Sequence, residues 1–389
     1  MLRMDLPESS LLNELPTELL LRIFEHLSSV ELCRCACVSS SWTSLVLEPK
    51  FWTAINFDNL LVDGATVLRV CQCYPELERL SLRNLSLDAR HLCAVFRACP
   101  RITSLTLAGT RAASGMEQVL HDLAQALTSL TELDLSTLAI TNSMLRRLQE
   151  RCASLQKLTL SRCTLSPDET LASGARTLHL THRNLRELTL SGIRISATEL
   201  RCPALEALDV SGAQLSDAML VSMVTSSPTL RTLAVADCRN VTDAAVKDCV
   251  ELRNDSITSL SLHAFSAMHS LKLACASLLT LELGRCCALT DASVTALAAG
   301  CPLLVSQRSL NAPRIPPPPL PLLPRVPVAQ RELSLEECEG ISHLALSSLS
   351  LQKLNLAGCK AIVTATLECA ALHVLVLEGC SALDDASIT

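Results

Sequence analysis

Leucines recur at one spacing along most of the chain. The pattern is Leu-x-x-Leu-x-Leu, with Ile or Val at some positions, and Leu77, Leu80 and Leu82 form its first copy. Copies begin at Leu77, Ile102, Leu130, Leu155, Leu185, Leu205, Leu230, Ile257, Leu278, Leu351 and Leu372. Up to Leu278, the intervals between them are 20 to 30 residues. This period is typical of leucine-rich repeats, in which each unit supplies one short strand and a return segment.

The spacing within each copy predicts how the unit folds. Alternate side chains of a strand point to opposite faces, so the leucines of Leu-x-Leu face inward and the residue between them faces outward. Longer units have room for a helix, as in residues 143–152, where Met144, Leu145 and Leu148 form an apolar stripe. Shorter units are predicted to return by a tight turn or a single helical turn. Because no unit can bury its leucines alone, we predict an α/β fold that stacks into a curved solenoid, with parallel strands on the concave face and helices or turns on the convex face.

Residues 11–57 follow a different pattern. Pro16 suits the first position of a helix, and an amphipathic helical stripe follows it, made of Leu19, Leu20, Ile23, Phe24 and Leu27. Two further helices are predicted over residues 29–38 and 40–47, the last ending before Pro49. A three-helix module of this size is too small for a strong core of its own. Its exposed apolar side is therefore expected to need a partner.

The residues of this module resemble an F-box. The resemblance rests on the segment from Leu15 to Leu27, on Leu32, on the spacing Val38-x-x-x-Trp42 and on the pair Phe51-Trp52, although Ser40 stands where the family often has Lys or Arg. Followed by cysteine-bearing leucine-rich repeats, it resembles the F-box/leucine-rich-repeat proteins, the plant-type members above all. The resemblance implies a non-catalytic substrate-recognition subunit of an SCF ubiquitin ligase. The F-box would bind the Skp-type adaptor, and through it cullin and a RING protein, while the repeats bind a protein substrate. The implied adaptor-binding residues are Leu15, Pro16, Leu19, Leu20, Ile23, Phe24, Leu27, Leu32, Val38 and Trp42.

A different class of function stays open beside this one. Solenoids need a cap at their ends, so the helices could merely shield the first repeat of an interaction scaffold that belongs to no ligase.

The substrate surface is predicted on the concave face, from residues beside the strand leucines. The candidates are Arg79, Arg83, Asp134, Asp209, Asp237, His263, Glu282, Arg285, Glu336 and Asn355. This set carries both signs of charge and contains no Trp or Tyr, the residue types that often supply binding energy at interfaces together with Arg. The partner is therefore expected to supply the anchoring side chains, or the arginines do so.

A proline-rich segment, residues 305–330, interrupts the repeats. Its run PPPPLPLLP is typical of polyproline II ligands of SH3, WW or profilin-type domains. However, deleting residues 305–330 joins Leu304 to Arg331 and restores an unbroken repeat, CPLLRELSLEEC. We therefore interpret the segment as an insertion between repeats at 58–304 and 331–389. Our hypothesis for its origin is a retained in-frame intron. The last of these repeats is predicted to be truncated.

Composition and charge narrow the function further. The 389 residues are 49% apolar and carry a net charge of −6, so neither nucleic acid nor an anionic membrane surface is an expected partner. The N-terminus lacks the features of a secretory signal, and no apolar run reaches the ~18 residues of a membrane span. Cytoplasm or nucleus is the expected location. Many of the 20 cysteines recur at equivalent positions of the repeats and are interpreted as small buried side chains there, and none of the 20 is predicted to form a disulfide or bind a metal. No phosphate loop, nucleophile motif or metal-ligand spacing stands out, so no catalytic residue, metal or cofactor is predicted.

Overall fold

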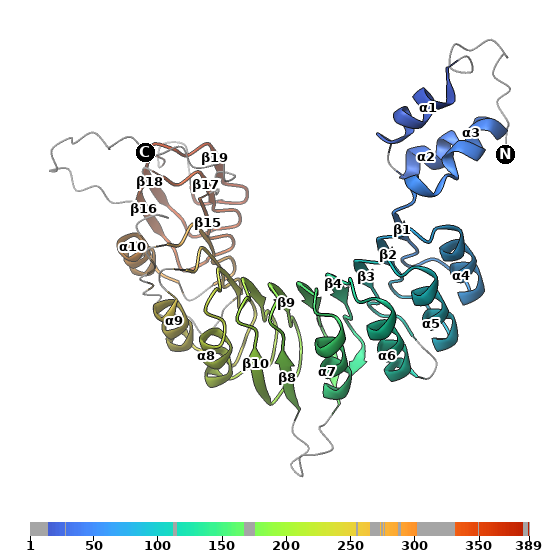
Figure 1. Cartoon of the computed structure of the whole chain (residues 1–389). Coiled ribbons are helices and arrows are strands. Elements are labelled where there is room, and N and C mark those ends of the chain that lie inside the picture. Colours follow the sequence, from blue (N-terminus) through green and yellow to red (C-terminus); the bar gives the residue numbers. More distant parts are fainter. Residues whose placement is uncertain are drawn as a thin grey trace, which may run out of the picture. The chain divides into compact units, whose positions relative to one another are not determined.

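A computed structural model of the chain (Figure 1) describes residues 15–27, 29–111, 115–166, 176–253, 256–264, 273, 275, 277–286, 289–301, 331–348, 350–383 and 388. The predicted insertion at 305–330 lies outside the described residues. The chain divides into two compact units. One unit is Met1–Asp134 with Glu150–Leu155, and the other is Leu135–Gln149 with Gln156–Thr389.

The first unit begins with the three helices expected from the sequence. They are α1 (Thr17–Phe24), α2 (Ser29–Cys35) and α3 (Ser40–Val46), and a short 3-10 helix, η1 (Pro49–Phe51), follows them. Phe24, Leu32 and Val46 form the buried core of this module. Ser39 is the N-cap of α3, because its hydroxyl oxygen accepts a hydrogen bond from the Trp42 amide at 3.2 Å.

Four parallel strands continue the first unit: β1 (Ala54–Asn56), β2 (Arg79–Ser81), β3 (Ser104–Thr106) and β4 (Glu132–Asp134). Their register aligns Ile55, Leu80, Leu105 and Leu133 in one row. Helices α4 (Gly64–Cys73), α5 (Ala89–Ala98) and α6 (Met116–Ala126) connect successive strands. The first strand of the ladder thus lies inside the segment that the sequence assigned to the helical module.

The second unit extends the same pattern over nine described strands. They are β6 (Lys157–Thr159), β9 (Glu187–Thr189), β11 (Ala207–Asp209), β12 (Thr232–Ala234), β13 (Ser259–Ser261), β14 (Thr280–Glu282), β15 (Glu332–Ser334), β17 (Lys353–Asn355) and β19 (Val374–Val376). Every neighbouring pair is parallel, and the register places the middle leucine of one strand beside that of the next. The predicted parallel ladder of leucines is confirmed.

The return segments differ from the prediction in the shorter units. Helices α7 (Asn142–Arg151), α8 (Asp217–Thr225), α9 (Asp243–Leu252) and α10 (Asp291–Gly300) return the longer ones, and α7 buries the predicted stripe of Met144, Leu145 and Leu148. The predicted tight turns are wrong for three short units of 20 or 21 residues, where the strands β10 (Ala197–Arg201), β16 (His343–Ser348) and β18 (Thr364–Cys369) occur instead. The 30-residue unit that begins at Leu155 has no helix among its described residues and contains β7 (Thr164–Leu165) and β8 (Thr177–Thr181). The strands pair in parallel, β7 with β5 (Ala139–Ile140), β8 with β10, and β16 with β18. Alternation explains them, because Leu344 and Leu346 are both buried while Ala345 between them is exposed.

A residue in the left-handed region follows almost every strand of the ladder. It lies two positions after the last strand leucine or valine, and examples are Arg162, Gly192, Gly212, Asp237 and Arg285. Its amide donates to a carbonyl of the next repeat, as Gly192 N does to Ser211 O at 2.7 Å and Gly212 N to Ala236 O at 2.7 Å. Positive φ is unfavourable for most residues with a side chain. The same backbone hydrogen bond recurs in successive repeats and stabilises this turn.

The cysteine that follows this turn is a hydrogen-bond donor as well as a small apolar group. The Cys163 thiol contacts Leu135 O at 3.1 Å, the Cys238 thiol Val210 O at 3.1 Å and the Cys359 thiol Leu335 O at 3.0 Å. At the equivalent place in an earlier repeat, the Thr110 hydroxyl donates to Leu82 O at 2.9 Å. Burial raises the pKa of the Cys238 thiol to about 11, so the thiol keeps its proton at neutral pH.

Replacing Cys238 tests this donor role. We expect Cys238→Ala to lower the free energy of unfolding by about 1–2 kcal/mol, through loss of buried volume and of the hydrogen bond to Val210 O. Cys238→Ser keeps a donor of similar size and should lose less. Urea unfolding followed by circular dichroism gives both values. If serine destabilises more than alanine, the thiol acts only as an apolar filler.

Candidate functional site

The residues of the helical module that were assigned to adaptor binding fall into two groups. Leu20, Phe24 and Leu32 are buried, and Trp42 packs against the core that Phe24 and Leu32 form with Val46. Phe24 contacts the Trp42 ring edge-on, with 5.2 Å between ring centroids. These residues hold the module together, so their substitution would not report on a partner alone.

The second group lies at the surface of the module. Leu19 and Ile23 are each 45% exposed, and Val38 is 43% exposed. Leu19 and Ile23 lie four residues apart in α1, and therefore on the same side of the helix. Pro16 is exposed as well, while Leu15 and Leu27 are half-buried. Leu19 and Ile23 together give α1 an apolar side that is almost half exposed to solvent.

Aromatic contacts fix the end of this module against the first repeat. The Trp52 indole N–H donates to Val46 O at 2.7 Å, at the end of α3. Its ring also contacts the Tyr74 ring at the end of α4, with 5.8 Å between centroids. Arg79, a predicted substrate-face residue, lines a cavity of about 600 Å³ together with Trp52 and Ile55.

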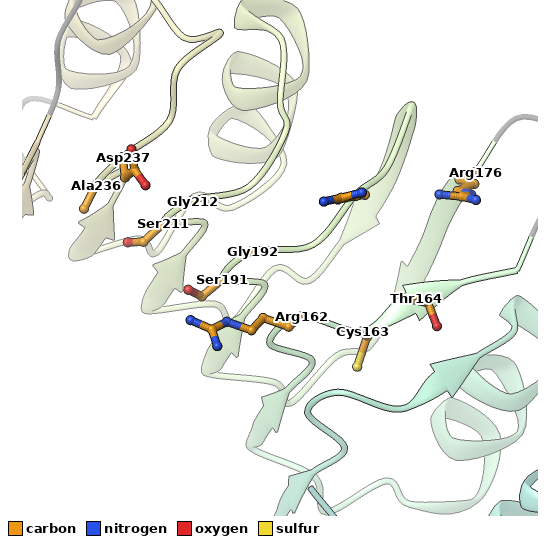
Figure 2. Close-up of a pocket in the computed structure, with 11 residues that line it drawn as sticks. Arg162, Cys163, Thr164, Arg176, Ser191, Gly192, Ser211, Gly212, Ala236 and Asp237 are labelled. Atoms are coloured by element: carbon orange, nitrogen blue, oxygen red, sulfur yellow. The ribbon is translucent and has the colours of Figure 1, made fainter. Parts of the chain in front are cut away.

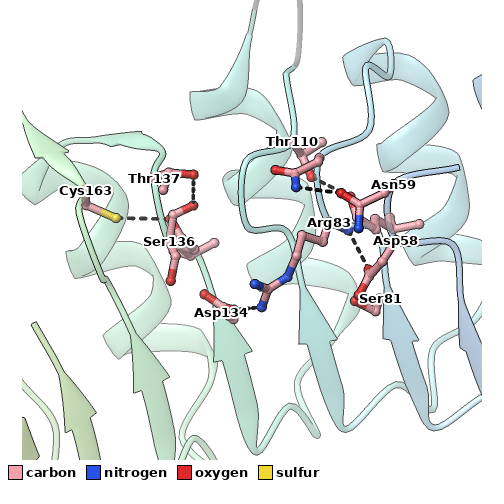
Figure 3. Close-up of polar contacts among 12 residues, drawn as sticks. Asp58, Asn59, Ser81, Arg83, Thr110, Asp134, Ser136, Thr137 and Cys163 are labelled. Carbon is pink, nitrogen blue, oxygen red and sulfur yellow. Dashed lines mark hydrogen bonds and ion pairs between the residues drawn. The ribbon is translucent and has the colours of Figure 1, made fainter. Parts of the chain in front are cut away.

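Ion pairs and hydrogen bonds organise the N-terminal part of the predicted substrate face (Figure 3). The Arg83 guanidinium reaches across β3 to Asp134, with 3.1 Å between Nη2 and Oδ2. Asp58 accepts hydrogen bonds from the Ser81 hydroxyl and from the Arg83 amide at 3.0 Å. Both predicted residues, Arg83 and Asp134, thus face each other on one surface.

Four other predicted residues of the second unit meet around one cavity. His263, Glu282, Glu336 and Asn355 line a space of about 270 Å³, together with Glu332 and Lys353 among others. The Lys353 ammonium lies 3.4 Å from a Glu332 carboxylate oxygen, and the Asn355 amide lies 3.4 Å from Glu336 Oε2. A Cβ on Gly284 would lie 2.6 Å from the His263 ring, so a larger residue there would displace this ring. The cavity therefore carries more acidic than basic groups.

The three remaining predicted residues lie apart from this cavity. Asp209 accepts a hydrogen bond from the Ser211 amide at 2.8 Å, so it stabilises the turn after β11. Arg285 forms two contacts with the Glu337 carboxylate, at 2.8 and 3.3 Å. Asp237 lines a separate hollow beside three arginines, Arg162, Arg176 and Arg194, which were not predicted as site residues.

Within the part of the chain that is described, no group of three or more His, Cys, Asp or Glu side chains is placed to hold a metal ion. The described helices also include none with the length and apolar character to cross a membrane.

Two segments of the chain match known protein families. Residues 12–58 match the family described as F-box-like, which covers α1 to α3 and β1. Residues 274–298 match the family described as Leucine Rich repeat, which covers β14 and most of α10.

Solved structures with a similar fold share little sequence. The chain is similar to the crystal structure of the Rad7 and Elc1 complex in yeast, at 14% identity over 95% of this chain and 90% of that chain, with a TM-score of 0.49. It is also similar to the leucine-rich repeat domain of APL1B, at 14% identity over 94% of this chain and 93% of that chain, with a TM-score of 0.40. Both scores are below 0.5, so these likenesses carry no further conclusion. The family matches and the strand ladder together show that the chain joins an F-box-like domain to leucine-rich repeats.

Proposed function

We propose that the protein is the non-catalytic substrate-recognition subunit of an SCF (cullin–RING) ubiquitin ligase in the cytoplasm or nucleus. The F-box-like helices bind a Skp-type adaptor, and through it cullin and the RING protein. The leucine-rich repeats bind a protein substrate so that it can be ubiquitinated.

The exposed apolar side of α1 is the observation that carries this proposal. The module already has a packed core, so Leu19 and Ile23 are not needed to build it. A single exposed apolar residue is ordinary on a protein surface. Here, however, both exposed large apolar residues of α1, Leu19 and Ile23, belong to the set that the F-box resemblance implied for adaptor binding. Burying this pair against an adaptor would supply the apolar contact that the small module lacks.

The repeats support the second half of the proposal. Their predicted substrate face carries groups of both signs, arranged in the Arg83–Asp134 pair and in the cavity around His263. Charged groups on a receptor surface favour selection and orientation of a partner more than raw affinity. This suits a surface that distinguishes one protein from another and catalyses nothing itself.

Adaptor capture by purified chains tests the proposal. We expect the double variant Leu19→Asp/Ile23→Asp to lose at least about tenfold in affinity for an immobilised Skp-type adaptor, since buried apolar anchors commonly contribute 2 kcal/mol or more each. The matched control is Leu252→Asp/Val363→Asp, because these residues are 48% and 47% exposed and lie in the repeats. The control should bind like the wild type.

Two results would contradict adaptor binding through α1. One is background capture by the wild type itself, which would leave the helices as a cap of the first repeat. The other is equal capture by the wild type and the α1 variant while both remain folded.

A further inference from the structure

A hollow lined by three arginines lies in the second unit, at the turns that follow β6, β9 and β11. Its volume is about 820 Å³, and Arg162, Arg176 and Arg194 line it together with the side chains of Thr164, Ser191 and Ser211. Figure 2 shows Arg162 extending toward Ser191, while Arg176 lies on the opposite side of the hollow. Basic side chains from three separate places in the sequence thus surround one space.

Two glycines explain why this space exists. Gly192 and Gly212 occupy the left-handed position after β9 and β11, where other repeats carry longer side chains such as Asp237, Arg285 and Glu337. A Cβ on Gly192 would lie only 3.0 Å from Arg162 Cγ. The absence of that atom lets the aliphatic part of Arg162 lie across the next repeat.

Backbone hydrogen bonds hold the segments that carry the three arginines. The Arg162 amide donates to Ser191 O at 2.7 Å, so its left-handed backbone is held by the next repeat. Ser196 N donates to Arg176 O at 2.9 Å, which joins the segments that carry Arg176 and Arg194. Ile193 and Ile195, on either side of Arg194, are buried and hold the backbone there, while Arg194 itself is exposed.

These arginines differ in their partners from others in the same unit. Arg186 pairs with Glu206 at 3.1 Å and Arg285 with Glu337 at 2.8 Å. Among the described residues, no carboxylate forms an ion pair with Arg162, Arg176 or Arg194. Asp237 is the only acid among the described residues that line the hollow, and it lies 3.7 Å from Arg239. The hollow therefore has excess positive charge in a chain whose net charge is −6.

We propose that this hollow binds an acidic segment of a protein, in which phosphoserine or closely spaced carboxylates enter among the three guanidinium groups. Guanidinium groups bind carboxylate and phosphate oxygens through two parallel hydrogen bonds, and the hydroxyls of Thr164, Ser191 and Ser211 offer further donors. The volume exceeds that of one anion and suits several residues of an extended segment. This inference rests on the proposed function, for which the hollow would be an anchor point of the substrate that shares only Asp237 with the predicted face.

Binding of model peptides to the full chain tests the site. The probe is a short fluorescein-labelled peptide of glycine and alanine that carries several phosphoserines, and matched peptides carry glutamate or serine at the same positions. We expect fluorescence anisotropy to show binding of the phosphoserine or the glutamate peptide in preference to the serine peptide. The comparison of the two anionic peptides shows which source of charge the hollow prefers. Excess inorganic phosphate should compete, and the affinity should fall as salt increases.

The variant Arg162→Gln/Arg176→Gln/Arg194→Gln should bind the anionic peptides at least about tenfold more weakly, as expected for the loss of charged contacts. The control Arg90→Gln/Arg146→Gln/Arg151→Gln removes the same charge from exposed positions of α5 and α7 and should leave binding unchanged. All three hollow arginines are exposed, so the variant should keep its fold.

An equal loss in both triple variants, equal binding of the serine peptide, or no binding by the wild type would overturn the inference. Failure of adaptor capture with intact peptide binding would instead contradict only the proposed ligase role. The two ideas can therefore fail separately.

Discussion

Replacing Phe24 by alanine is expected to unfold the helical module and with it to abolish adaptor binding. Phe24 is the largest side chain of the module core, is 1% exposed and contacts both the Trp42 and the Phe51 rings. Truncating a buried phenylalanine to alanine costs about 3–5 kcal/mol. A module of this size has no such reserve of stability. The leucine-rich repeats should remain folded, because their own leucine ladder does not include Phe24.

Tryptophan fluorescence measures this outcome selectively. The chain has only two tryptophans, Trp42 and Trp52, and both lie in or beside the module core. In the Phe24→Ala variant we expect their emission to shift to that of solvent-exposed tryptophan, while far-UV circular dichroism keeps most of its signal. The control is Ile23→Ala, at the neighbouring exposed position, which should leave the emission unchanged. A native spectrum of the Phe24→Ala variant would show that this core is not what holds the module together.

Excising residues 305–330 should stabilise the second unit. Strand β14 pairs directly with β15, with Leu281 beside Leu333, although 302–330 lie between the two repeats in the sequence. The Cys338 thiol contacts Leu283 O at 3.2 Å, the same contact that Cys286 makes with Leu262 O at 3.2 Å. Excision leaves only residues 302–304 between Cys301 and Arg331, and the shorter loop should raise the free energy of unfolding by about 2 kcal/mol.

The urea midpoint of the excised chain is the quantity to measure. As a control, replacing residues 305–330 by a glycine–serine segment of equal length should give a midpoint near that of the full chain, since loop length and not loop sequence sets the entropy cost. A lower midpoint after excision would mean that the segment belongs to the folded unit. If the segment is a retained intron, sequencing of mature transcripts should also show it to be absent.

The strand ladder could be predicted from the sequence because one spacing encodes it. Every copy of Leu-x-x-Leu-x-Leu has the same local geometry, so the parallel register follows from stacking equal units. The return strands β8 and β16 could not be recognised as easily. The alternation of leucines in each covers only a few residues, and strand propensity over so short a stretch does not distinguish a strand from a turn.

The functional surfaces were predictable only in part. The amphipathic stripe of α1 placed Leu19, Leu20, Ile23 and Phe24 together, yet the packing of α2 and α3 decides which of them are buried. The hollow was missed because its arginines belong to different return segments and meet only in the fold. The sequence did contain a signal for one of these arginines. Arg162 lies two positions after the last leucine of its repeat signature, and Asp237 and Arg285 occupy the same position in their own repeats. Asp237 and Arg285 were predicted as substrate-face residues on this basis, and Arg162 could have been predicted in the same way.

Amide hydrogen exchange of the full chain with and without a Skp-type adaptor tests the central claim most directly. Binding through the F-box-like helices predicts increased protection in α1 to α3, residues 17–46, with the largest change in α1 around Leu19 and Ile23. The amides of β6 to β19 in the second unit should exchange at the same rate in both samples. Protection confined to the repeats, or no change in α1 at saturating adaptor, would contradict the proposed role of this module.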